Sequence, residues 1–256
     1  MNTQKLIVFD MDGVIIDVSG SYREAVRQTA RLFFNGVVSE DDLPDPLFSL
    51  ADLASVKQAG GLNNDWELTF HVLTLLLTEV AAPAEASNLP GWDCLGELKA
   101  TCDVAALARF LKSSTTPLAD LHKQHPGPPN PWIERLSSGN VGTGNVIKQI
   151  FQELYLGETL FRNTYGFAPL IHDGQGLIDR ESLLISPTVF NRLAEENILA
   201  LATGRPRSEA EHALDRFNLK PYFNMTYTLD ECLAEEKRIY EKSGKYTSLG
   251  KPHPFM

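Results

Sequence analysis

Residues 6–17 read LIVFDMDGVIID, and this stretch decides the fold. Its first four residues are apolar and predict a short buried strand that ends at Asp10, followed closely by Asp12 and Gly13. Side chains two residues apart on an extended strand point to the same side, so both carboxylates can address one reaction centre. Open α/β sheets bind their ligands at the carboxyl ends of their strands. Because two close carboxylates repel one another and rarely help folding, the stretch indicates a functional site.

Composition narrows the class of protein. Hydrophobic residues make up 43% and charged residues 22% of the 256 residues, as in ordinary soluble globular proteins. The formal net charge of -10 argues against sequence-independent nucleic-acid binding, which needs a basic face. The cysteines Cys94, Cys102 and Cys232 form no CxxC pair, which fits a reducing compartment. The amino terminus leads directly into a strand without a secretory signal, and the longest apolar run falls well short of the ~20 residues of a membrane span. We expect a cytoplasmic protein with neither a nucleic-acid nor a membrane partner.

The last third of the chain alternates helical patterns with short apolar runs. The pattern predicts a helix over 187–196, a strand over 198–203, a helix over 208–217, a strand over 224–228 and a helix over 230–243. Such alternation is typical of a parallel sheet, and the strand at residues 6–9 must join it. The predicted fold class is therefore α/β, with a Rossmann-like parallel sheet core and a large inserted α-helical cap domain. We assign residues 1–17 and 181–256 to the core and residues 18–180 to the cap.

Within the insertion, apolar periodicity predicts helices over 22–33, 66–80 and 145–155. Residues 83–144 are instead rich in proline and glycine. We interpret that segment as mostly loop, with one helix over 104–112.

Three segments resemble motifs of the haloacid dehalogenase (HAD) superfamily, in particular its helical-cap, phosphatase-like subgroup. The run from Asp10 to Gly13 resembles the DxDG signature. The strand that ends in Thr203 resembles the second motif, and the run Gly250–Pro254, which contains Lys251, resembles the Lys-Pro-x-Pro form of the third. The order of the motifs and the helical insertion between the first two match the family arrangement.

The resemblance implies a phosphatase that uses Mg²⁺ and acts on a small phosphorylated metabolite. Asp10 would be the nucleophile that forms an aspartyl-phosphate, and Asp12 would first protonate the leaving oxygen and then activate water. The Thr203 hydroxyl and the Gly204 amide would hold phosphoryl oxygens, while Lys251 would orient and neutralise Asp10. The family implies that Mg²⁺ is held by the Asp10 carboxylate and the backbone carbonyl of Asp12.

Three further residues carry open alternatives. Arg205 either reaches the substrate or forms a structural salt bridge. Asn64 and Asp65 either contact substrate groups from a cap loop or cap the helix that begins near Trp66.

The resemblance stops before the fourth family motif, a strand whose terminal acidic residues supply another Mg²⁺ ligand. No such strand follows Lys251 in the printed sequence, so we expect a sheet edge and apolar surface to be uncovered. The favoured explanation is a truncated piece of a longer active phosphatase. The alternatives are a phosphomutase of the same superfamily, or a noncatalytic protein that binds a phosphorylated ligand or a partner.

Overall fold

The computed structural model describes residues 4–60, 62, 64–125, 130–251 and 253–255. The chain divides into two compact units. We call residues 1–18 together with 181–256 the core unit, and residues 19–180 the cap unit.

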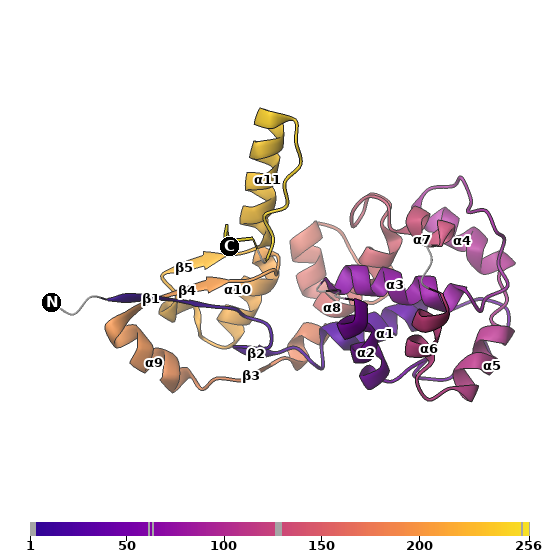
Figure 1. Ribbon diagram of the computed structural model, residues 1–256, viewed down its shortest axis with the longest axis horizontal. Helices are drawn as coiled ribbons and strands as arrows, with labels where there is room; N and C mark the ends of the chain where they lie inside the picture. Colours follow the sequence, from indigo (N-terminus) through magenta and orange to yellow (C-terminus); the bar gives the residue numbers. More distant parts are fainter. Residues whose placement is uncertain (1–3, 61, 63, 126–129, 252, 256) are drawn as a thin grey trace. The chain divides into compact units, whose positions relative to one another are not determined.

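A parallel sheet forms the centre of the core unit (Figure 1). Its strands are β1 (Lys5–Phe9), β4 (Asn197–Ala202) and β5 (Met225–Tyr227), in the spatial order β1–β4–β5. Phe9 is opposite Leu201 and Ala202 is opposite Tyr227, so the three strands end at the same edge. The predicted α/β class with a Rossmann-like parallel sheet and helical insertions is confirmed.

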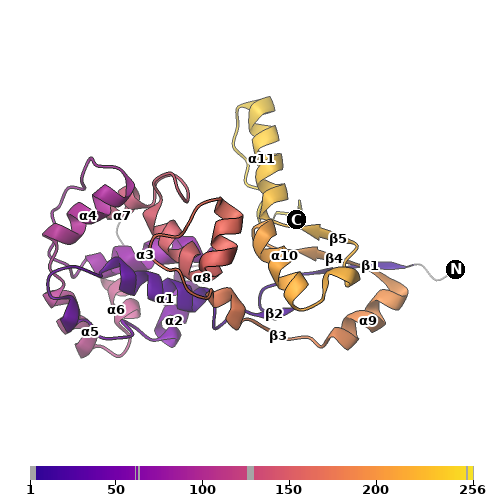
Figure 2. The same ribbon diagram turned by 180° about the vertical axis from the view of Figure 1, so that it is seen from behind.

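Helices cover one face of this sheet. Leu199 and Leu201 point to that face and pack with Phe190 of α9 (Pro187–Glu196) and with Leu214 of α10 (Arg207–Arg216). A short 3-10 turn, η3 (Lys220–Tyr222), then leads into β5, and α11 (Leu229–Ser243) follows that strand. In Figures 1 and 2, α11 extends away from the sheet.

The opposite sheet face is apolar and exposed. Leu6 and Val8 of β1 are each 55% exposed, and Met225 and Tyr227 of β5 are 43% and 41% exposed on the same side. Parallel sheets are usually covered on both faces. Among the described residues β1 pairs with β4 alone, so an edge and an apolar face are uncovered, as the sequence predicts.

The chain leaves and re-enters the core unit through a second, two-stranded sheet. Here β2 (Ile16–Asp17) pairs antiparallel with β3 (Ser182–Leu183), and η2 (Leu177–Arg180) precedes β3.

Helices with a shared apolar core form the cap unit. The contacts between α1 and α3 and between α1 and α8 are the most extensive in it, and Val26, Val72 and Ile150 are fully or almost fully buried there. The elements are α1 (Tyr22–Phe33), η1 (Glu40–Asp42), α2 (Leu50–Gly60), α3 (Asp65–Leu77), α4 (Gly91–Thr101), α5 (Ala105–Ser113), α6 (Pro117–Gln124), α7 (Pro131–Leu136) and α8 (Val146–Tyr165). None of the described helices is long and apolar enough to span a membrane.

The prediction that residues 83–144 are mostly loop was wrong, because α4, α5, α6 and α7 all lie there. The prolines mark helix starts: Pro90 is the N-cap of α4, and Pro117 and Pro131 occupy the first positions of α6 and α7. Proline is favoured at those positions because its missing N–H and fixed φ cost nothing in the first turn.

Candidate active site

A turn that begins at Met11 follows β1 and contains the second aspartate of the opening motif. The N–H groups of Ile15 and Ile16 donate to the Met11 carbonyl at 2.9 and 3.0 Å, and Gly13 adopts a left-handed φ of 71°. Met11 is fully buried in the core. The side chains of Asp10 and Asp12 remain 46% and 32% exposed. Both carboxylates therefore lie just beyond the carboxyl end of β1, where the chain has left the strand and entered a turn.

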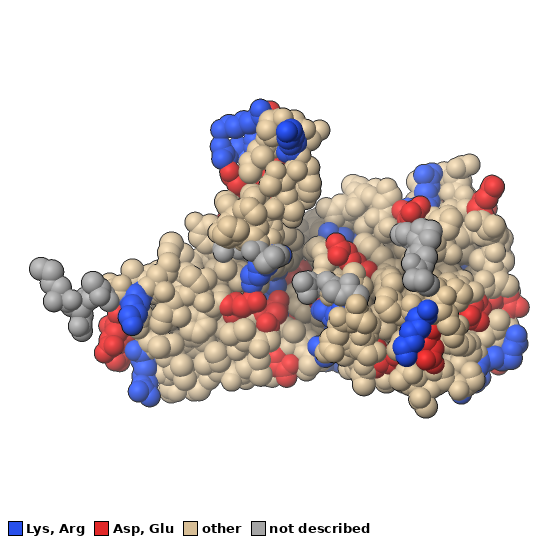
Figure 3. Space-filling model, viewed as in Figure 1, with Lys and Arg blue, Asp and Glu red and all other residues tan. Residues whose placement is uncertain are grey.

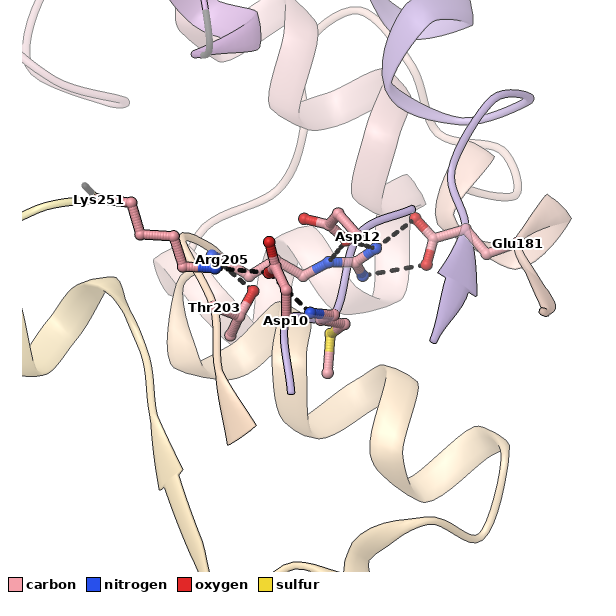
Figure 4. Close-up of polar contacts among 7 residues, drawn as sticks. Asp10, Asp12, Glu181, Thr203, Arg205 and Lys251 are labelled. Atoms are coloured by element: carbon pink, nitrogen blue, oxygen red, sulfur yellow. Dashed lines mark hydrogen bonds and ion pairs between the residues drawn. The ribbon is translucent and has the colours of Figure 1, made fainter. Parts of the chain in front are cut away.

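Lys251 contacts Asp10 directly (Figure 4). Its Nζ lies 2.5 Å from Asp10 Oδ1, and the same oxygen accepts a hydrogen bond of 2.7 Å from the Met11 N–H. Asp10 Oδ2 makes no hydrogen bond within the described parts of the chain. The structure thus brings together the first and third motif residues, which are 241 positions apart. Pro252, part of the quoted third motif, lies outside the described residues.

Asp12 is anchored by a buried arginine. Arg205 Nε donates to Asp12 Oδ1 at 2.7 Å, and its two terminal nitrogens donate to the two Glu181 carboxylate oxygens at 3.0 and 3.1 Å. Arg205 is 1% and Glu181 is 3% exposed. This bidentate pair holds the guanidinium rigidly, and Asp12 is fixed by it through one oxygen (Figure 4).

The geometry at Arg205 agrees with the salt-bridge alternative. Each of its three side-chain nitrogens has a carboxylate partner in the protein, so contact with a substrate stays a prediction. Glu181 was not among the predicted site residues. The one available signal was indirect, since a buried arginine at a strand end needs a counter-charge.

Thr203 follows β4 and is fully buried. Its N–H donates to the Tyr227 carbonyl at 2.9 Å, and its hydroxyl oxygen accepts from the Arg205 N–H at 3.2 Å. The neighbouring Gly204 is exposed. Thr203 and Gly204 therefore stand at the same sheet edge as Asp10, and their phosphoryl contacts remain a prediction.

The two predicted cap residues have partners inside the cap unit. Asn64 Oδ1 accepts from the Trp66 N–H at 2.9 Å, which makes Asn64 the N-cap of α3. Asp65 Oδ1 lies 2.7 Å from Lys57 Nζ. The capping alternative therefore holds for Asn64, while substrate contacts by either residue are a prediction.

The donor set suits a magnesium ion. Asp10 presents an exposed carboxylate, the ligand type that Mg²⁺ prefers, and the expected second ligand is the backbone carbonyl of Asp12. Over the described ranges, no group of three or more His, Cys, Asp or Glu side chains is placed to hold a metal. Mg²⁺ often uses only one or two carboxylates and completes its shell with water and substrate phosphate, so the two aspartates fit.

Charged side chains elsewhere on the core unit gather at the end of α11 remote from the sheet (Figure 3). Those on the last two turns of the helix include Arg238 and Lys242.

Comparison with known proteins supports the fold. No protein-family model matches the chain. Phosphatase Tt82 from Thermococcus thioreducens superposes with a TM-score of 0.51 at 18% identity, over 97% of this chain and 94% of that one. The chain shares its fold with a phosphatase. A crystal structure from the Northeast Structural Genomics Consortium superposes with a TM-score of 0.60 at 19% identity, over 99% of this chain and 76% of that one.

A short stretch also resembles a curated protein. The chain is 40% identical over 67 residues to an imidazoleglycerol-phosphate dehydratase from Phytophthora nicotianae. The match spans 26% of this chain and 12% of that protein.

Proposed function

We propose that this protein is a Mg²⁺-dependent phosphatase that cleaves a small-molecule phosphate monoester through an aspartyl-phosphate on Asp10. The observation that carries the proposal is the grouping at one sheet edge. An exposed carboxylate paired with Lys251 lies beside a second carboxylate that a buried arginine holds in place. The likeness to a phosphatase fold supports it.

The two oxygens of Asp10 suit a nucleophile. Lys251 and the Met11 N–H bind Oδ1, which fixes the carboxylate and leaves Oδ2 to attack phosphorus. The new bond joins Oδ2 to phosphorus while the ester oxygen departs with its electron pair. The Lys251 ammonium offsets charge on the phosphoryl oxygens, which otherwise repel an anionic nucleophile.

Asp12 is suited to the proton transfers. Arg205 holds its Oδ1, so the other oxygen can carry the proton that passes to the departing ester oxygen. In the second half-reaction the same carboxylate accepts a proton from the water that attacks the phosphorus, and Asp10 is released. The Thr203 hydroxyl and the Gly204 amide would hold phosphoryl oxygens. Mg²⁺, held by the Asp10 carboxylate and the Asp12 backbone carbonyl, would add charge neutralisation at the phosphoryl group.

The test is hydrolysis of p-nitrophenyl phosphate and of a panel of phosphorylated metabolites, with Mg²⁺ and with a chelator. Wild-type protein should release phosphate only with the metal, and Asp10→Asn should reduce turnover to background. Asp215→Asn, an exposed carboxylate on α10, is the matched control and should retain activity. Acid-stable capture of labelled phosphate on Asp10 would identify the intermediate.

Three results would count against the proposal. Turnover by Asp10→Asn equal to wild type contradicts the nucleophile assignment. Transfer of the phosphoryl group within a sugar phosphate, through a bisphosphate, identifies a phosphomutase instead. Binding of phosphorylated ligands without hydrolysis of any of them identifies a noncatalytic protein.

A further inference from the structure

The site lysine comes from a segment that is held by a helix rather than by the sheet. We infer that Glu236, on α11, positions Lys251 against Asp10 by binding the backbone of Leu249. This inference rests on the proposed function for its consequence in catalysis, whereas the contact itself is independent of it.

The base of α11 is fixed to the loop that carries the site residues. Thr228 and Glu231 form a capping box, in which Glu231 Oε2 accepts from the Thr228 N–H and hydroxyl, each at 2.7 Å. Arg207 forms an ion pair with Glu231. The Leu229 N–H donates to the Arg205 carbonyl at 2.9 Å. The helix therefore has a defined origin relative to Arg205 and Asp12.

The chain then turns back along the helix. Gly244 ends α11 in the left-handed conformation, with a φ of 65°, and the following segment returns beside α11 toward the sheet (Figures 1 and 2). A glycine allows this reversal because other residues rarely adopt a positive φ.

Two buried side chains of α11 hold the returning segment at Leu249. The Leu249 N–H donates to Glu236 Oε1 at 2.7 Å, and the Cys232 thiol donates to the Leu249 carbonyl at 3.6 Å. The Tyr246 hydroxyl donates to Glu236 Oε2 at 3.2 Å. Leu249, Glu236 and Cys232 are 3%, 6% and 0% exposed. Burial raises the pKa of the Cys232 thiol, and the nearby Glu236 and Glu231 raise it further, so the sulfur keeps the proton that it donates.

The bonds of Glu236 and Cys232 to the Leu249 backbone, which we call the clamp, restrict the positions that the Lys251 ammonium can reach. Lys251 follows Leu249 by two residues, which span at most about 7 Å of chain. Its side chain is flexible and 38% exposed, and its contact with Asp10 is the single tie that the structure describes. With Leu249 fixed, the ammonium searches a small volume that includes Asp10. Beyond Gly244, the described hydrogen bonds from this segment to α11 are those of Lys245 with Ser243 at the helix end, of Tyr246 with Glu236, and of Leu249 with Glu236 and Cys232. The Leu249 bonds are the ones nearest to Lys251 along the chain.

The test combines an activity-independent readout with kinetics. Lys251 is methylated reductively in the full chain with formaldehyde and cyanoborohydride, and its labelling is measured by mass spectrometry relative to the exposed Lys112 of the cap unit. Glu236→Ala should raise the ratio severalfold because Lys251 leaves Asp10. Glu236→Gln keeps an acceptor for the Leu249 N–H and should stay near wild type. Glu235→Ala, which removes the adjacent ion pair with Arg238, is the matched control.

Kinetics with p-nitrophenyl phosphate and Mg²⁺ then ask whether Glu236 acts through Lys251. Misplacing a catalytic group by about 1 Å can lower the rate ~100-fold, and we expect Glu236→Ala to lower kcat/KM by about that factor. In a Lys251→Ala background the same substitution should change little, because the group that it positions is gone. A general structural role would instead lower both backgrounds equally.

The outcomes separate the two proposals. If Glu236→Ala is folded by circular dichroism and labels like wild type, the clamp is overturned, whatever the activity. If it does not fold, Glu236→Asp keeps the buried carboxylate but draws it back from the Leu249 N–H by one methylene, and unchanged labelling of that variant overturns the clamp. If labelling changes as expected but the wild type hydrolyses nothing, the clamp stands and the phosphatase proposal fails.

Discussion

Removing Glu181 tests the buried ion pair of the site. Glu181→Ala deletes both carboxylate oxygens that bind Arg205, at 3.0 and 3.1 Å. The side chains of the pair are 0% and 1% exposed, so bulk solvent does not reach the guanidinium that loses its carboxylate. The variant leaves a buried guanidinium that still contacts the Asp12 carboxylate.

The cost follows from those contacts. A hydrogen bond to a charged group contributes ~1.5–3 kcal/mol, so two give about 3–6 kcal/mol. Removing one partner of a buried ion pair lowers the free energy of unfolding by ~3–5 kcal/mol in comparable cases. Asp12 is 32% exposed and offsets part of the charge, which places the expected loss near the lower end, about 3 kcal/mol. Glu181→Gln retains one acceptor and should lose roughly half as much.

Two different probes can follow the urea unfolding of the two units separately. Trp66, Trp92 and Trp132 all belong to the cap unit, so tryptophan fluorescence reports that unit. Hydrogen exchange of β4 peptides reports the core unit. With a urea dependence of ~1–3 kcal/mol per molar, the core transition of Glu181→Ala should move down by about 1–3 M.

An exposed ion pair provides the control. The side chains of Lys220 and Asp215 are 57% and 61% exposed, and such pairs contribute about 0–1 kcal/mol. Asp215→Ala should therefore barely move either transition. If Glu181→Ala costs no more than Asp215→Ala, the buried Arg205–Glu181 pair does not hold the core unit together, and the reasoning from burial is refuted.

Two predictions concern the cap unit. Asp52 is 2% exposed and accepts hydrogen bonds from the Leu118 and Ala119 N–H groups at 2.8 and 3.1 Å. Asp52→Ala should therefore lower the free energy of unfolding of the cap unit, followed by fluorescence, by ~2–4 kcal/mol. Replacing the exposed Asp93 by alanine should not lower it. Burial, and secondarily His122 at 3.0 Å, lower the pKa of His71 below its usual value of about 6.5. The unfolded chain therefore binds the proton more readily, and the contribution of His71 to stability is complete above pH ~6.5 and lost as the pH falls through the folded pKa. Melting temperatures by fluorescence at pH 7.5 and 5.5 should differ less for His71→Gln than for wild type, and an equal difference would contradict this assignment.

Local patterns were sufficient to predict the sheet and the strand-end residues. A short apolar run that ends in a polar side chain is a strong signal, and it identified β1 with Asp10 and β4 with Thr203. The contact of Lys251 with Asp10 is a different matter, because it joins segments 241 residues apart. The resemblance to the family, through the order of its motifs, predicted that Lys251 lies near Asp10. Hydrophobic periodicity alone does not predict contacts between distant segments.

The prolines of the cap unit are the reason why residues 83–144 were wrongly predicted to be mostly loop. Pro117 and Pro131 break a periodic pattern whether they end one helix or begin the next, and a loop is the simpler interpretation of a segment dense in both proline and glycine. Burial decides between a loop and a helix after each proline. Leu121 and Trp132, just after these prolines, are almost entirely buried, so the short helices are stabilised by packing rather than by helix propensity.

The parts of the site that the sequence did not predict share one physical property. Glu181 and Glu236 are carboxylates that act on other site groups, through Arg205 and through the backbone of Leu249. A charge of this kind has no local pattern, since its position is set by a partner on another segment, 24 residues away for Glu181 and 13 for Glu236. Glu181 can be inferred only in reverse, because a buried arginine must have counter-charges. Arg205 was recognisable from its place after β4, and the bidentate contact with Glu181 holds the guanidinium that binds Asp12.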